Sequence, residues 1–293
     1  MRIADRGLRI QKTIIVLFLI FSSGYVSLAA QDQQVGQLDG LKKLPQKFSF
    51  VVLGDNRSGD EMYKKIIAQA MARKPDLIMS TGDVITTPGS LNDWSKFREL
   101  SKIVNVPYFL TVGNHDAHPK VPGSETIYRE QVELPGNELY YSFIAGNALF
   151  IVLDSNLDGQ EKKISGEQRS WLEDVLANAK QRHTFIFVHH PLYTEKGKGK
   201  HAGDCLDRYP GDRDWLQALF RRHGVTAVFS GHEHVYLRKN AGGIPYVTTG
   251  GGGAPLYADD LNGGFFHYVY VTVDGNTVNG EVVDVNGKIR DRF

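Results

Sequence analysis

Short apolar runs, each followed at once by a polar cluster, constrain the fold of this chain more than any other feature of its sequence. Five such runs are rich in Val, Ile, Phe and Leu, which is typical of strands buried on both faces. They span residues 48–53, 76–80, 106–111, 184–188 and 225–230. Helical spacing is found between them, at 60–73, 92–104, 166–180 and 213–223. Strands that alternate with helices predict parallel βαβ units and an α/β fold.

A polar cluster stands at the carboxyl end of each of these predicted strands. In chain order the clusters are Gly54-Asp55-Asn56-Arg57, Gly82-Asp83, Gly113-Asn114-His115-Asp116, His189-His190-Pro191 and Gly231-His232-Glu233-His234. Because ligands of α/β proteins bind beyond the carboxyl ends of the strands, we expect the clusters to lie together at one edge of one sheet. Glycine beside an acidic residue or a histidine fits a sharp turn with a close backbone approach.

The side chains in these clusters are typical of a metal site. Carboxylate oxygen, amide oxygen and imidazole nitrogen suit Zn, Fe or Mn rather than metals that select thiolates, and the single cysteine, Cys205, cannot build a thiolate site. A carboxylate that bridges two ions about 3.5–4 Å apart lowers the pKa of a trapped water, and the resulting hydroxide can attack phosphorus. The sequence therefore predicts a dinuclear metal site that hydrolyses phosphate esters.

The order Asp, Gly-Asp, Gly-Asn-His-Asp, His, Gly-His-x-His resembles that of the calcineurin-like metallophosphoesterase superfamily. The resemblance covers about residues 48–253, and the segment 246–253 with the last histidine pair is most similar to the purple-acid-phosphatase-like branch. We expect a four-layer α/β/β/α sandwich of two mixed sheets with helices outside. In this arrangement residues 48–153 would supply one sheet and residues from 184 to the end the other. Further strands are expected at 140–144, 148–154, 235–239, 245–249, 266–273 and 277–285.

The resemblance also implies a role for each residue of the clusters. One metal would be held by Asp55 and His234, the other by Asn114, His189 and His232, with Asp83 bridging the two ions. His115 would contact the leaving-group oxygen or a phosphoryl oxygen, and Asp116 would fix the orientation of His115. The implied cofactors are two divalent or trivalent ions of the Fe, Mn or Zn class.

One position departs from the family pattern. The usual first motif is Asp-x-His, whereas Asp55 is followed two residues later by Arg57, whose guanidinium has no lone pair for a metal. Nor does the tyrosine of purple acid phosphatases occur three residues after the bridging Asp, where this chain has Thr86. We therefore expect the first site to be the weaker one. Arg57 would either clamp a phosphoryl oxygen of the substrate or form a structural ion pair with Asp55 or Asp83.

Several other residues allow two interpretations. His201 and His267 would lie either at the rim of the site or away from it, and their roles stay open. Lys196, Lys198 and Lys200 alternate with glycines, which is usual in a solvated mobile loop but would also attract anionic substrates.

Length and composition predict a single domain at residues 46–293, preceded by a polar lead-in at 30–45. With 293 residues, 41% of them hydrophobic, the chain can bury a large core without disulfides. The net charge of +1 gives no indication of a nucleic-acid partner, and the oligomeric state stays open.

The segment 1–29 has the features of a signal peptide. Four basic residues precede the apolar stretch 13–21, and Ser27-Leu28-Ala29 fits a cleavage site. We expect a periplasmic or secreted protein with no stable membrane anchor after cleavage, and the alternative is an uncleaved N-terminal anchor helix.

Two functions are consistent with these features. The first is a secreted metal-dependent phosphohydrolase that cleaves a phosphomonoester or phosphodiester of a small phosphorylated substrate. The alternative is a catalytically impaired binding or scaffold protein on the same fold, because Arg57 replaces a ligand histidine.

Overall fold

The computed structural model describes residues 36–293. The predicted signal peptide at 1–29 lies outside these residues, as does the start of the polar lead-in. Across the described part of the chain, none of the helices combines the length and the apolar character needed to span a bilayer.

The described residues form two six-stranded sheets. The first sheet has the order β12-β11-β10-β1-β2-β3, in which β1, β2 and β3 are parallel while β10, β11 and β12 run antiparallel to their neighbours. Its strands are β1 (Lys47–Leu53), β2 (Leu77–Ser80), β3 (Tyr108–Leu110), β10 (His267–Asp274), β11 (Thr277–Asp284) and β12 (Ile289–Arg292).

The second sheet has the order β4-β5-β6-β7-β9-β8, with β5, β6, β7 and β9 parallel and β4 and β8 antiparallel at its two edges. Its strands are β4 (Tyr141–Ala145), β5 (Ala148–Leu153), β6 (His183–Val188), β7 (Ala227–Ser230), β8 (Tyr236–Ala241) and β9 (Ile244–Thr249).

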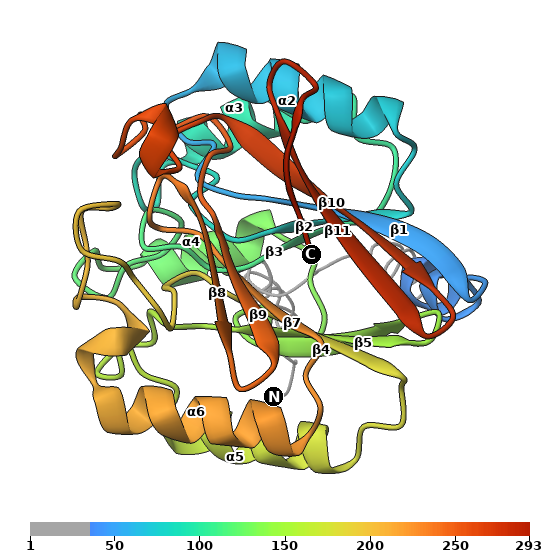
Figure 1. The fold of residues 1–293 in the computed structure, drawn as a ribbon. Helices are drawn as coiled ribbons and strands as arrows, with labels where there is room; N and C mark the ends of the chain where they lie inside the picture. Colours follow the sequence, from blue (N-terminus) through green and yellow to red (C-terminus); the bar gives the residue numbers. More distant parts are fainter. Residues whose placement is uncertain (1–35) are drawn as a thin grey trace, which may run out of the picture.

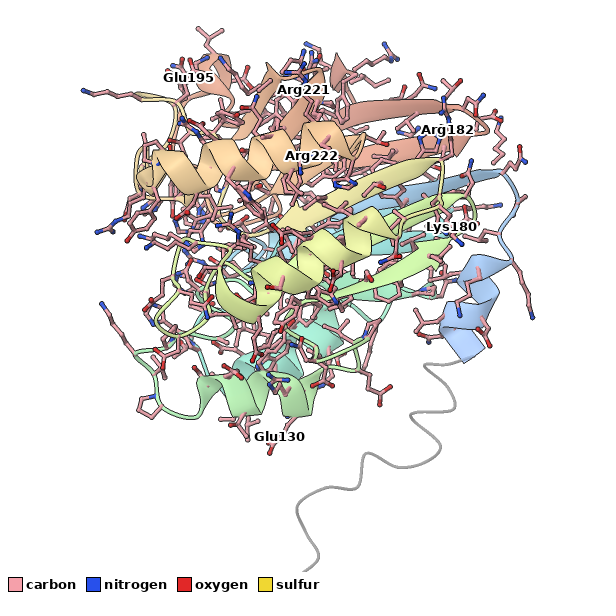
Figure 2. The ribbon with its side chains drawn as sticks, turned by 90° about the horizontal axis from the view of Figure 1, so that it is seen from below. Glu130, Lys180, Arg182, Glu195, Arg221 and Arg222 are labelled. Carbon is pink, nitrogen blue, oxygen red and sulfur yellow. The ribbon has the colours of Figure 1, made fainter. Side chains whose placement is uncertain are left out.

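Helices cover the outer faces of both sheets. The first sheet is covered by α2 (Asp60–Ala72) and α3 (Leu91–Leu100), and the second by α5 (Gly166–Ala177) and α6 (Pro210–Arg222), so that four layers result (Figure 1). Seen from the side of the second sheet, α5 and α6 lie next to each other, with Arg221 and Arg222 at the end of α6 (Figure 2). A further helix, α4 (Ser124–Gln131), packs its Tyr128 against Trp94 of α3.

Aromatic side chains lock the two sheets together. Phe50 of β1 lies edge-on against Phe150 of β5 and Phe185 of β6, with ring centroids 5.1 and 4.9 Å apart. All three side chains are fully buried, and each buried phenylalanine contributes about 1.5–3 kcal/mol through its removal from water. Since these contacts join the central strands of opposite sheets, they also fix how the carboxyl ends of those strands face one another.

The four-layer α/β/β/α sandwich of two mixed sheets is confirmed, but the expected division of the strands between the sheets is wrong. The hairpin β4–β5 belongs to the second sheet, where β5 pairs with β6, and β10 returns to the first sheet to pair with β1. Apolar periodicity identifies strands but not the strands with which they pair. One edge of β1 pairs with β2, and the other edge pairs with β10 from the far end of the chain.

The sequence indicated neither α4 nor β12. The burial of α4 is limited to Ser124 and Tyr128, so it carries little apolar periodicity, and β12 has only four residues.

Candidate metal centre

The five polar clusters meet where the carboxyl ends of both sheets face each other. The clusters follow β1, β2 and β3 in the first sheet and β6 and β7 in the second. The expectation that they share one edge of one sheet is therefore wrong. Two sheet edges supply them, and the packing of the sheets brings them together.

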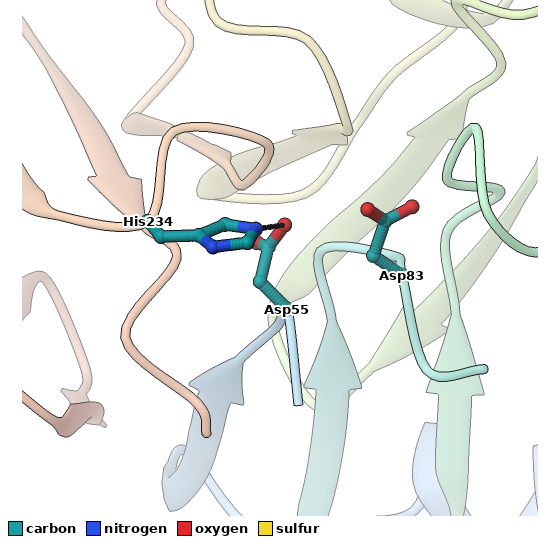
Figure 3. A group of neighbouring side chains, drawn as sticks. All are labelled: Asp55, Asp83 and His234. Carbon is teal, nitrogen blue, oxygen red and sulfur yellow. Dashed lines mark ion pairs between the residues drawn. The ribbon is translucent and has the colours of Figure 1, made fainter. Parts of the chain in front are cut away.

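The first group consists of Asp55, Asp83 and His234, each of which offers one ligand atom within 4.8 Å of the others. Asp55 follows β1, Asp83 follows β2, and His234 lies on the segment that leads into β8 (Figure 3). All three side chains are buried, and His234 Nε2 lies 3.5 Å from Asp55 Oδ1. Burial, followed by the nearby Asp83, raises the pKa of Asp55 well above its usual value.

The orientation of His234 fits a cation in this first group. Its Nδ1–H donates to the carbonyl oxygen of Pro255 at 2.7 Å, so Nε2 carries a lone pair that faces Asp55. Nε2 is buried and has no hydrogen-bond partner among the described residues. Burial lowers the pKa of His234 to about 4, so a proton does not satisfy this nitrogen near neutral pH. A lone pair and a carboxylate repel each other, whereas a metal ion between them would be bound by both.

The second group consists of Asn114, His189 and His232. Asn114 Oδ1 lies 3.1 Å from His189 Nε2 and 3.0 Å from His232 Nδ1, and the two ring nitrogens are 3.2 Å apart. His189 Nδ1–H donates to the carbonyl of Thr81 at 2.8 Å, which leaves the lone pair on Nε2. Burial lowers the pKa of both histidines. Two neutral imidazoles and an amide oxygen that converge in this way have the donor set of a metal site.

Asp83 lies between the two groups. Its Oδ1 is 3.4 Å from His189 Nε2 of the second group, and the same carboxylate belongs to the first group. Burial acts to raise the pKa of Asp83, but interactions with His189, His115 and the Arg57 guanidinium outweigh it and lower the pKa below its usual value. The carboxylate therefore stays ionised, as a bridge between two cations requires.

Three of the candidate ligands have left-handed backbone conformations. The φ angles are 57° for Asp55, 57° for Asp83 and 67° for His232. Such conformations cost about 1–3 kcal/mol for residues other than glycine, and they gather at functional sites where the surrounding structure holds them. Glycine makes the tight assembly possible, because a Cβ at Gly113 would collide with the Asp83 carboxylate and one at Gly231 with that of Asp55.

Asp116 does not orient His115, which corrects the role that the sequence implied. The Asp116 carboxylate accepts four backbone N–H groups, at distances of 2.7 to 3.2 Å, and contacts no atom of the His115 ring within hydrogen-bond distance. The donors are Asp83, Val84, Ile85 and Gly113. Burial and the charge of Asp83 raise the pKa of Asp116 to about 8, while the N–H groups act to lower it. Asp116 therefore ties the loop after β2 to the loop after β3.

His115 takes its orientation from the loop after β2. Its Nδ1 lies 2.6 Å from the carbonyl oxygen of Thr86, to which it donates, and its backbone N–H donates to Asp83 Oδ1 at 2.9 Å. Nε2 is then the ring atom that carries the lone pair.

Arg57 forms an ion pair with the central carboxylate. Its Nε lies 3.1 Å from Asp83 Oδ2, and the side chains are 16% and 2% exposed. The pair matches the structural interpretation left open by the sequence, and it places a permanent cation beside the first group.

Two residues at the site were not singled out by the sequence for the positions they take. The Tyr257 ring stacks on His234 at a centroid distance of 4.0 Å, and the Glu233 side chain is buried. His201, whose position the sequence left open, lies at the rim of the site, where its ring is 4.4 Å from that of His232. No sequence signal identifies Tyr257, since it lies in a loop. His267, in contrast, is fully buried and hydrogen-bonds Thr249 and the Phe265 carbonyl, so it belongs to the core.

Comparisons with known proteins give one consistent family. A family model described as calcineurin-like phosphoesterase matches residues 48–236. The serine/threonine-protein phosphatase CPPED1 of Danio rerio is 30% identical over 229 residues, which are 72% of this chain and 71% of that protein. The rat protein of the same name (Rattus norvegicus) is 32% identical over 58% of this chain and 55% of its own length.

A similar fold occurs in the purple acid phosphatase PPD1 from yellow lupin (Lupinus luteus) seeds. The TM-score is 0.71 at 21% sequence identity, over 85% of this chain and 54% of the lupin chain. The chain thus spans about half the length of the rat and lupin proteins that it matches.

Proposed function

Because the chain belongs to the calcineurin-like phosphoesterase family, we propose that it is a metal-dependent phosphohydrolase that cleaves a phosphomonoester or phosphodiester of a small phosphorylated substrate. The observation that carries this proposal is the pair of ligand groups that share Asp83. Each group contains a buried histidine whose lone pair is turned inwards by a hydrogen bond from its other nitrogen.

The two groups would hold two ions of the Fe, Mn or Zn class. Asp55 and His234 would bind the first ion, Asn114, His189 and His232 the second, and Asp83 both. Bound ions of this kind supply a water with a lowered pKa that can act as a nucleophile near neutral pH. The first site has fewer ligands, so we propose that it is the weaker one.

Two side chains would act on the substrate directly. With a proton on each ring nitrogen, His115 would keep its Nδ1–H contact with Thr86 and donate its Nε2–H to a phosphoryl or leaving-group oxygen. Arg57 donates through Nε to Asp83, and its remaining N–H groups would bind a phosphoryl oxygen. The two interpretations of Arg57 are thus compatible, because one guanidinium can serve the carboxylate and the substrate together.

The relatives support monoester hydrolysis as the first activity to test, because both CPPED1 proteins are named as serine/threonine-protein phosphatases. The alternative is a catalytically impaired scaffold, and the observation in its favour is that the Arg57 guanidinium already neutralises part of the Asp83 charge.

A substrate panel with metal add-back separates the two functions. Purified protein is stripped with a chelator, restored with Mn²⁺, Fe²⁺ or Zn²⁺, and assayed on nitrophenyl phosphate, a bis(nitrophenyl) ester and pyrophosphate, with bound metal measured in each sample. The proposal expects turnover of at least one ester that returns with the metal. Stoichiometric metal without turnover of any of them would establish the scaffold instead.

We further propose that the protein is exported to the periplasm or beyond, on the basis of the segment 1–29. Fractionation of the native host followed by sequencing of the protein's N-terminus tests this proposal. A start near Ala30 in the soluble fraction supports export with cleavage, and a membrane-bound protein that retains the segment establishes the anchor.

A further inference from the structure

Glu233 stands between two candidate metal ligands, His232 and His234, in the sequence, yet its carboxylate points to the loop at 194–208. It is 1% exposed, and its Oε2 and Oε1 accept the backbone N–H groups of Lys200 and His201 at 2.7 and 2.6 Å. A Cβ at Gly199 would collide with the same carboxylate, so glycine allows the loop to approach. An ionised acceptor makes strong hydrogen bonds to such donors. The turn that carries His232 and His234 is therefore also the anchor of the loop.

The anchored loop contacts an imidazole of the second ligand group directly and reaches the imidazole of the first group through Tyr257. The His201 ring is 4.4 Å from that of His232 in the second group. The Nζ of Lys200 lies 4.1 Å from the centroid of the Tyr257 ring, which in turn stacks on His234 of the first group.

The remainder of the loop is fixed as well. Asp207 accepts hydrogen bonds from the Thr194 hydroxyl and from the backbone N–H of Cys205, and Asp204 pairs with Lys162 at 2.6 Å. The loop at 194–208 is thus held at both ends and beside the metal centre, and Lys200 is the residue of its lysine series that reaches the site.

We propose that Glu233 is a positioning residue that holds this loop in place, and that Lys200 is a cationic subsite which selects phosphate esters whose leaving group carries a negative charge. The proposal rests on the proposed function. A cation–π contact limits where the Lys200 ammonium can go, while the residue remains exposed and open to substrate. The Lys200 ammonium contacts the Tyr257 ring, which stacks on His234, so one aromatic ring separates it from the nearest candidate ligand, and it would meet the leaving group and not the phosphoryl group.

The first experiment tests the anchor without catalysis. Amide hydrogen exchange is measured on the metal-loaded full chain for wild type, Glu233→Gln and Glu195→Gln. Glutamine keeps the shape of Glu233, but its side-chain NH₂ would face the backbone N–H of either Lys200 or His201. Two donors cannot form a hydrogen bond, so one of the two contacts is lost. We expect exchange at Lys200 and His201 to become at least tenfold faster in Glu233→Gln, with bound metal unchanged. Glu195→Gln is the matched control, because Glu195 is an exposed residue of the same loop (Figure 2). Equal protection in all three proteins overturns the anchor.

The second experiment tests the subsite by charge selectivity. The ratio of kcat/KM for 4-carboxyphenyl phosphate to that for phenyl phosphate is measured in wild type, Lys200→Met and Lys198→Met. Each protein is assayed on the same two esters, so the difference in intrinsic reactivity between the esters cancels when the ratios are compared. We expect the ratio to fall about fivefold in Lys200→Met, mainly through KM, and the fall to shrink at high salt because the ammonium is exposed.

The matched control is Lys198→Met, since Lys198 pairs with Glu195 in the same loop, and it should keep the wild-type ratio. An unchanged ratio in Lys200→Met, or an equal fall in Lys198→Met, overturns the subsite. If wild type hydrolyses neither monoester under any metal condition, the subsite is overturned. The proposed function fails as well if the bis(nitrophenyl) ester is not turned over either, whereas the exchange experiment still decides the anchor.

Discussion

His267 provides a quantitative link between the core and the pH dependence of stability. Its Nδ1–H donates to the Phe265 carbonyl at 2.8 Å and its Nε2 accepts from the Thr249 hydroxyl at 3.1 Å, so the fold requires the neutral ring. Burial lowers the pKa of His267 from its ordinary value of 6.5 to about 4. Since one pKa unit corresponds to about 1.4 kcal/mol, this lowering corresponds to about 3 kcal/mol of folding free energy.

The sign follows from proton uptake. Between pH 6.5 and pH 4 the unfolded chain binds a proton at His267 that the folded chain excludes, so the stability contributed by this group is complete above pH 6.5 and is lost as the pH falls. We expect about 2 kcal/mol of the free energy of unfolding to be lost through His267 between pH 8 and pH 5, and the full amount only well below pH 4.

The assay is urea unfolding of the metal-free protein at pH 8 and at pH 5, for wild type and for His267→Asn. The asparagine amide can still donate to the Phe265 carbonyl but does not titrate. Because asparagine is smaller than histidine, the variant loses the same amount of stability to a cavity at both pH values and lacks this pH dependence. Other histidines titrate equally in both proteins and cancel in the difference. If the variant loses as much stability as wild type on acidification, His267 is not a buried neutral group and the reasoning is refuted.

Four further substitutions, at three residues, test the site. Arg57→Ala should raise KM or lower kcat at unchanged metal content, whereas Arg57→His should bind the first metal more tightly. Wild-type kinetics in Arg57→Ala together with unchanged metal affinity in Arg57→His would leave Arg57 a purely structural partner of Asp83. His115→Ala should lower kcat by about 10²–10⁴ with its metal retained, as measured by steady-state kinetics beside metal analysis, and parallel loss of metal would mean that His115 is a ligand. Asp116→Asn should lower the free energy of unfolding, measured with urea, by about 1–3 kcal/mol, because the amide places a donor against backbone N–H groups. An unchanged free energy of unfolding would show that these four hydrogen bonds do not hold the two loops together.

The layers of the fold and the meeting of the five clusters could be predicted from the sequence, because both depend on local patterns. Apolar runs that end in Gly-Asp or Gly-His mark strand ends, and strand ends are where ligands gather in this class of fold. The assignment of strands to sheets could not be predicted in the same way. Val269 of β10 pairs with Val52 of β1, and nothing local to either segment specifies a partner more than two hundred residues away.

The functions of the acidic residues around the ligands were also hidden from the sequence. Asp116 and Glu233 stand inside motifs that suggest a part in catalysis, but their carboxylates accept backbone N–H groups from neighbouring loops. Spacing places such residues near a site, whereas the direction of each carboxylate depends on loops whose conformation is fixed only in the assembled fold. The same limit applied to Tyr257, which reaches His234 from a loop near the end of the chain.

Metal stoichiometry in wild type and Asp83→Asn tests the central claim most directly, since the Asp83 carboxylate belongs to the first ligand group and lies 3.4 Å from His189 Nε2 of the second. Calorimetric titration of the metal-free proteins with Mn²⁺ should show two ions per wild-type chain, the second bound more weakly. The variant should bind at most one ion, with no turnover of phosphate esters, because a neutral amide cannot hold two cations together. Two ions bound with wild-type affinity by Asp83→Asn, or none bound by wild type, would contradict a metal centre built around this bridge.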